Sequence, residues 1–350
     1  NTTGTNGVAV GAEALKTNTT GDFNTGIGFA ALEANTTGSN NTAIGFAALD
    51  ANTTADFNTA VGKDALTANT TGTENVAIGG NSLDANSTGS YNTAVGTSAL
   101  GANTTGAENT AVGVNSLDAN TTGANLVAVG MHSLGANTTG NNSTAVGHGA
   151  LFTSTTASEN TAVGFAALTN CTTGGANTAI GYVSMQNLTE GTNNTAVGNQ
   201  SMTAITTGTH NVAMGREALD ANTTASNNVA VGKAAGENTG VGNEAMESNT
   251  TGANNTAIGG GALASNTTSS ENVAVGRSAL LSSTGGFNTA VGSHAMDNLT
   301  SGTDNTVVGY HALGGATTAT NCVSVGESSY TTLTSGDFCA NLGAENAVNS

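Results

Sequence analysis

Apolar and polar positions recur along this chain in a pattern that repeats every 17 residues. A Val or Ile usually precedes a Gly, a Leu or Met follows four positions after that Gly, and Asn, Thr and Ala fill most other places. The idealised unit reads N-T-A-V-G-x-x-A-L-x-x-N-T-T-G-x-x, and it occurs 21 times. Thr, Val, Asn and Gly favour strands and turns over helices. The repeat therefore predicts an all-β fold, a parallel β-solenoid (β-roll) of about 21 coils with a 17-residue repeat.

Each position of the unit becomes a row of stacked side chains in such a solenoid, and the residues of a row indicate what it packs against. The pattern predicts two short strands per coil, one at N-T-A-V and one around A-L and N-T-T. We expect two apolar rows to face each other across a thin coil and to form the core. One row is Val10, Ile27, Ile44, Val61 and their equivalents, and the other is Leu15, Leu32, Leu49, Leu66 and their equivalents.

Two further rows carry specific expectations. The Asn at the head of the strand can hydrogen-bond to its equivalents along the stack; the row begins with Asn24, Asn41, Asn58 and Asn75. If the Val or Ile of the strand faces the core, alternation turns the preceding alanine outward. A small residue there indicates that another backbone lies close, so the candidate interface is Ala43, Ala60, Ala77 and Ala94 with their equivalents. The alternative is that tight corners within one coil require small residues.

Irregular units mark special places along the chain. Gly232 and Gly242 are ten residues apart, which predicts a shortened coil at 233–241 and a kink, a dent or a shifted register near Lys233 to Asn238. We predict one solenoid over residues 1–343 and a C-terminal tail at 344–350. Cys322 and Cys339 occupy the Asn row one coil apart, a separation that permits either a disulfide or a pair of buried thiols.

Aromatic side chains fall at variable turn positions, where a receptor would find them. The possible surface contacts are Phe29, Phe46, Phe57, Tyr91 and Phe165. Scattered exposed aromatic residues are also common where they have no such role.

Composition excludes several function classes. Only 8% of residues are charged, and the formal net charge of −18 argues against binding nucleic acid through a basic surface. No stretch approaches the roughly 18 apolar residues that span a bilayer, so we expect no membrane insertion by this segment. The five histidines are dispersed and do not gather with carboxylates in one repeat. We therefore expect no catalytic site, no metal site and no cofactor.

The strand motif N-[TV]-A-[IV]-G, seen from Asn75 to Gly79 and from Asn272 to Gly276, resembles the head repeats of trimeric autotransporter adhesins. It is equally similar to the N-T-A-V-G arrays of phage tail-fibre proteins. In the adhesin heads, three chains each form a left-handed parallel β-roll around a common axis, and the resemblance implies such a homotrimer here. The 17-residue coil is longer than the usual head repeat, and no neck, stalk or anchor is visible.

These observations predict a structural or adhesive extracellular fibre segment, an adhesin head or a tail-fibre shaft, on a cell surface or virion. Its expected partners are copies of itself and a cell-surface or glycan receptor. The alternative is a self-assembling filament whose subunits stack end to end. A third hypothesis is ice binding by threonine rows such as Thr36 and Thr37, although adjacent strand residues point to opposite sides.

Overall fold

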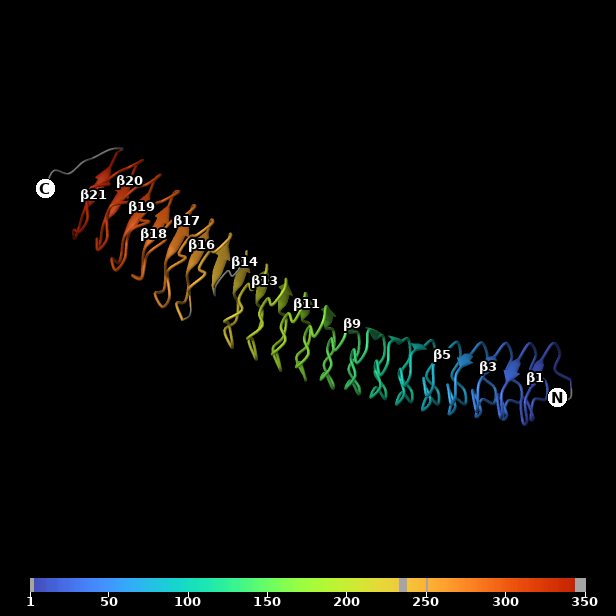
Figure 1. Ribbon diagram of the computed structural model, residues 1–350. Coiled ribbons are helices and arrows are strands. Elements are labelled where there is room, and N and C mark those ends of the chain that lie inside the picture. Colours follow the sequence, from blue (N-terminus) through green and yellow to red (C-terminus); the bar gives the residue numbers. More distant parts are fainter. Residues whose placement is uncertain (1–2, 233–237, 250, 344–350) are drawn as a thin grey trace. The chain divides into compact units, whose positions relative to one another are not determined.

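The chain divides into two compact units, residues 1–190 and 191–350, called here the N-terminal and C-terminal units. The computed structural model describes residues 3–232, 238–249 and 251–343. Each unit is a parallel β-solenoid in which every coil contributes one three-residue strand, and the described residues contain no helix. Figure 1 shows the successive coils of each unit stacked side by side, with their strands along one side.

The strands of the N-terminal unit are β1 (Val8–Val10), β2 (Thr25–Ile27), β3 (Thr42–Ile44), β4 (Thr59–Val61), β5 (Val76–Ile78), β6 (Thr93–Val95), β7 (Thr110–Val112), β8 (Val127–Val129), β9 (Thr144–Val146), β10 (Thr161–Val163) and β11 (Thr178–Ile180). The strands of the C-terminal unit are β12 (Thr195–Val197), β13 (Val212–Met214), β14 (Val229–Val231), β15 (Thr239–Val241), β16 (Thr256–Ile258), β17 (Val273–Val275), β18 (Thr289–Val291), β19 (Thr306–Val308), β20 (Val323–Val325) and β21 (Ala340–Leu342).

Neighbouring strands pair in parallel and in register with the repeat. Thr42 pairs with Thr59, and Ile44 pairs with Val61, a shift of one unit. At the shortened coil Val229 pairs with Thr239, so the strand register is kept there. A polar hollow of about 380 Å³ lies beside these strands. Residues 233–237 of the predicted dent lie outside the described residues.

The predicted second strand of each coil is wrong, because turns occupy that side. The Leu four positions after the glycine has a positive φ, +53° at Leu66, which a strand does not allow. Coils are still hydrogen-bonded there, since Leu32 N donates to Ala48 O at 3.0 Å. The corner position requires glycine for two reasons, because its φ is positive and because a Cβ would collide with the next coil. At Gly79, with φ +133°, an added Cβ would lie 2.5 Å from the Gly96 carbonyl oxygen of the next coil.

The assignment of the two strand faces in the sequence analysis is also wrong. Apart from Ala9 in the first coil, which is exposed, the alanine row is fully buried. The Val and Ile row is on the surface, with Ile27 37%, Ile44 38% and Val10 56% exposed, and Val61 partly exposed. The buried alanines are Ala43, Ala60, Ala77 and Ala94 with their equivalents. The cause is the narrow interior. At Gly26, which stands in the alanine row, an added Cβ would already lie 3.3 Å from Leu15 Cγ. The alanines are therefore small because of the opposing leucines, and they cannot form an interface between chains.

The leucine row is confirmed as core. Leu32, Leu49 and Leu66 are fully buried, and Leu15 nearly so. Each packs behind the alanine row, so the interior consists of one layer of small and one layer of large apolar side chains. Stability accumulates from contacts between neighbouring coils rather than from one central core.

The asparagine row at the head of the strands is buried and hydrogen-bonded along the stack, as predicted. The Asn41 backbone N–H donates to Asn24 Oδ1 at 2.9 Å, and Asn75 repeats this bond to Asn58 at 3.0 Å. A second asparagine row, Asn18, Asn35, Asn52, Asn69 and their equivalents, lies beside the first, because Asn24 Nδ2 and Asn35 Nδ2 both donate to Gly38 O, at 2.7 and 2.9 Å. There Asn35 Nδ2 donates to Asn18 Oδ1 at 2.8 Å. The two rows satisfy buried polar groups that the apolar core could not.

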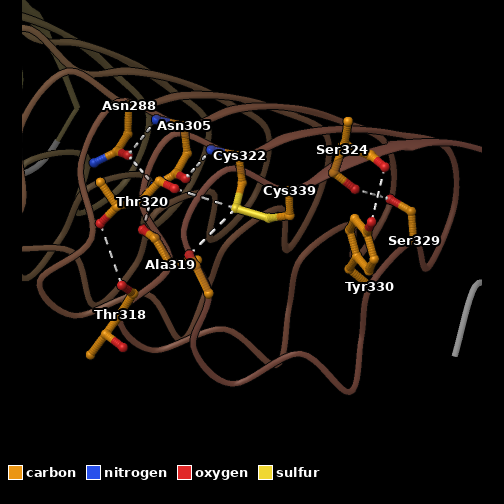
Figure 2. The surroundings of a disulfide bond; sticks show 12 residues. Asn288, Asn305, Thr318, Ala319, Thr320, Cys322, Ser324, Ser329, Tyr330 and Cys339 are labelled. Atoms are coloured by element: carbon orange, nitrogen blue, oxygen red, sulfur yellow. Dashed lines mark hydrogen bonds between the residues drawn. A yellow bond between two sulfur atoms is a disulfide. The ribbon is translucent and has the colours of Figure 1, made fainter. Parts of the chain in front are cut away.

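Cysteine residues replace asparagines in these rows. Cys322 and Cys339 form a disulfide between successive coils, with their Cα atoms 4.5 Å apart. Figure 2 shows that Cys322 continues the asparagine row, its backbone N–H donating to Asn305 Oδ1 at 3.0 Å. The third cysteine, Cys171, is a buried free thiol in the second asparagine row. Burial raises its pKa to about 11.

Candidate functional surfaces

The outer side of the strands forms an uncharged surface of Thr, Val and Ile side chains, called here the strand face. In the N-terminal unit its first row is Val8, Thr25, Thr42, Thr59, Val76, Thr93, Thr110, Val127, Thr144, Thr161 and Thr178. Its second row is Val10, Ile27, Ile44, Val61, Ile78, Val95, Val112, Val129, Val146, Val163 and Ile180. Every one of these residues is β-branched and none is charged. The rows stay partly or fully exposed.

The strand face is long and uncharged. Eleven strands at ~4.8 Å spacing, each with two outward side chains about 7 Å apart, give an area on the order of 500 Å². Monomeric proteins expose apolar patches of about 300–600 Å², and here eight of the 22 side chains are threonines, whose hydroxyls are polar. The C-terminal unit carries the same two rows on its own strands, with Met214 and Ala340 among the few exceptions.

The aromatic residues singled out in the sequence are all exposed on turns. Phe29, Phe46, Phe57, Tyr91 and Phe165 each expose about half of their surface or more. Phe29 and Phe46 stack on each other, with ring centroids 5.4 Å apart. Only Phe165 lies in a larger group.

That larger group, called here the aromatic cluster, consists of His132, His148, Phe152, Phe165 and Tyr182. His148, Phe165 and Tyr182 stack in sequence, with centroids 5.4 and 5.5 Å apart. His132 meets Phe152 edge to face at 5.7 Å and is perpendicular to His148 at 6.3 Å. Beside these rings lies a hollow of about 280 Å³. The cluster therefore combines exposed rings in several orientations with a concave surface.

Sequence reasoning missed most of this cluster because its members come from three different rows. His148 and Phe165 directly follow the repeat glycine, His132 is second after it, and Phe152 is fifth. Each row looked variable when read alone. A comparison of these three rows together over residues 131–186 would have shown the aromatic residues gathering in neighbouring coils.

The histidines are less dispersed than the sequence indicated. Besides the pair in the aromatic cluster, His294 Nδ1 lies 3.0 Å from Asp297 Oδ2 within a single coil, which corrects the expectation that no histidine meets a carboxylate. Within the described residues, no three His, Cys, Asp or Glu side chains come together in a group that would hold a metal ion.

The threonines proposed for ice binding differ in their surroundings. Thr36 donates its hydroxyl to the Thr53 carbonyl of the next coil at 2.9 Å, and Thr53 does the same to Thr70 at 3.3 Å. Thr37 is exposed. One of the two hydroxyl rows is therefore already engaged within the solenoid.

No protein-family model matches the chain, and a comparison with curated proteins gives no significant relative. In the part of the chain that the structure describes, no helix could cross a lipid bilayer. The function must therefore be argued from the surfaces themselves.

Proposed function

We propose that this chain is a structural, adhesive segment of an extracellular fibre that associates with copies of itself, in a homotrimer, through the strand face. The observation that carries the proposal is the double row of exposed, mostly β-branched side chains on the strands of each unit. Association removes the apolar groups of this surface from water, which is the main driving force for most protein assembly. The alanine row plays no part in it.

A second copy of the chain fits this surface better than an unrelated partner does. The rows rise by one strand spacing per coil, so the surface has ridges and grooves with a period of ~4.8 Å. A parallel, in-register copy has the same period over its whole length, and its side chains interdigitate as they do between the sheets of stacked-β structures. A partner of different period would match at only a few points.

The Cys322–Cys339 disulfide supports an extracellular location, on a cell surface or virion. Disulfides persist in oxidising compartments and are rare in the reducing cytosol. The exposed aromatic residues on the turns remain available to a receptor when the strand face is covered, because they lie outside its two rows. Display of turns on a covered, stacked scaffold is what an adhesive fibre requires.

The test is native mass by light scattering over a concentration series. The unmodified chain should show the mass of three chains at all concentrations. A double variant, Ile78→Lys with Val112→Lys, places two charges on the strand face and should yield monomers. The control, Thr71→Lys with Thr105→Lys, adds the same charge at exposed turn positions of nearby coils and should leave the trimer intact.

Three outcomes would contradict the proposal. A monomer at every concentration removes the self-association, and thermal hysteresis in that monomer would favour ice binding instead. A mass that grows with concentration would favour the end-to-end filament. A trimer that survives the strand-face lysines as well as the control would place the interface elsewhere.

A further inference from the structure

The hollow beside the aromatic cluster results from a local departure from the repeat. In the second position after the glycine, each of the other coils of the N-terminal unit carries a side chain, from the small Ala30 and Ala47 to the larger Asp64 and Asn81. The cluster has Gly149 there, and a Cβ added at Gly149 would meet nothing within 4 Å. The next coil has Ala166, so two successive coils leave this space open, and His132 closes the row on one side.

The walls of the hollow are aromatic and weakly polar. Phe152 and Phe165 supply phenyl rings, His132 and His148 supply imidazoles, and Gln186 supplies an amide. In the fifth position after the glycine, four other coils of this unit place carboxylates, at Glu33, Asp50, Asp84 and Asp118. The four coils that line the hollow have Gly135, Phe152, Thr169 and Gln186 at that position instead. The acidic charge that dominates the chain is therefore absent from the lining.

This chemistry narrows the ligand class. A phosphate or sulfate would need permanent cations, and residues 131–190 contain no Lys or Arg. A divalent metal would need more than the two imidazoles. The hollow, at about 280 Å³, is at the small end of ligand pockets, about 300–1,000 Å³, which suits a single ring.

We infer that this hollow binds one neutral pyranose residue of a glycan. The weakly positive C–H bonds of one sugar face would pack on the negative face of Phe152 or Phe165. The hydroxyls would hydrogen-bond to the ring nitrogens of His132 or His148 and to the amide of Gln186. The inference deepens the proposed adhesive function by naming its receptor class, and it rests on that function for its biological purpose.

The test is saturation-transfer NMR and calorimetric titration of the full chain with methyl glycosides of glucose, galactose, mannose and N-acetylglucosamine. At least one should bind in the millimolar range or tighter. Phe152→Ala and Phe165→Ala should each weaken binding by about 3- to 10-fold, the usual range for loss of an aromatic contact. Phe46→Ala is the control, because Phe46 stacks on Phe29 in the same row as Phe165 but does not line the hollow.

Gly149→Gln fills the hollow without removing any wall. The backbone tolerates this substitution, because Gln200 occupies the same position of another coil with φ +57°, close to the +64° of Gly149. This variant should abolish binding while circular dichroism and thermal melting stay unchanged. No binding of any pyranoside, binding that resists Gly149→Gln, or preferential binding of a tetramethylammonium probe in this hollow would overturn the inference.

The ligand assay does not depend on assembly. A monomeric chain that binds a pyranoside would refute the proposed trimer and support the sugar site. A trimer that binds none of the glycosides would support the assembly and refute the sugar site.

Discussion

A gap in the second asparagine row offers a substitution that should stabilise the N-terminal unit. Asn137 and Ser154 occupy successive coils of that row, and among the described residues Asn137 Oδ1 and Ser154 Oγ are buried without a hydrogen-bond partner. Elsewhere in the row each asparagine amide donates to the one before, as Asn120 does to Asn103 at 2.9 Å. Ser154→Asn should restore this bond to Asn137.

The size of the gain follows from the bonds that form. The new Nδ2 also reaches the Ala157 carbonyl, by analogy with Asn52, which donates to Ala55 at 3.1 Å. Two added hydrogen bonds are worth about 0.5–1.5 kcal/mol each. The new Oδ1 then faces Cys171, whose weak S–H donor already bonds to the Gly174 carbonyl at 3.2 Å, which reduces the total. We expect a gain of about 1–2 kcal/mol, which lowers the open population of these coils by about 5- to 30-fold.

Hydrogen exchange in the neighbouring coils measures this gain directly. The amides of Thr138 and Thr155 donate to the next coil, at 2.8 and 3.2 Å, and should exchange more slowly in the variant. The control is Ser143→Asn, because the Ser143 hydroxyl already accepts from the Asn160 backbone N–H at 3.2 Å, and it should give a smaller gain. Unchanged exchange in Ser154→Asn, or an equal gain in the control, would refute the reasoning.

Three further predictions concern the buried polar and sulfur groups. Asn92→Ala should destabilise its coils by about 1–3 kcal/mol in urea unfolding, because the Asn109 N–H then loses its acceptor Asn92 Oδ1; a neutral result would count against the asparagine row as a stabilising element. Cys171 should resist thiol reagents at pH 8 until the chain unfolds, since its folded pKa is raised from 9.0 to about 11. The folded state therefore holds this proton more tightly, so stability should be constant below pH 9 and fall by about 1–3 kcal/mol as pH rises through 11, a loss that Cys171→Ala should not show. Reduction of the Cys322–Cys339 bond, which closes a 17-residue loop, should lower protection of the β21 coil by about 3 kcal/mol while exchange in the N-terminal unit stays the same.

The repeat predicted much of this fold because each row of a solenoid samples one environment many times. The buried leucines, the hydrogen-bonded asparagine row and the adjacency of Cys322 and Cys339 could all be anticipated from spacing, which left open whether the two thiols are bonded. The spacing could not predict which side of each strand faces the core. Alternation says that Ala43 and Ile44 face opposite ways, but not which of them faces inward.

The volume of the interior decides which strand residue faces inward. The leucine of each coil nearly fills the space behind the strand, so alanine fits and isoleucine does not. Leu66 also adopts a positive φ that leucine rarely takes, and no residue pattern indicated this turn. The aromatic cluster was hidden for a different reason, because neighbours across coils are found only when several rows are compared together.

Single-cysteine cross-linking tests the central claim most directly, namely that the strand face points outward and meets its own copies. Under mild oxidation, Val95→Cys should give disulfide-linked chains on a non-reducing gel, because equivalent residues of in-register copies lie close together. Ala94→Cys, on the buried side of the same strand, and Thr105→Cys, on an exposed turn, should not. Cross-linking through Ala94→Cys with none through Val95→Cys would contradict the account.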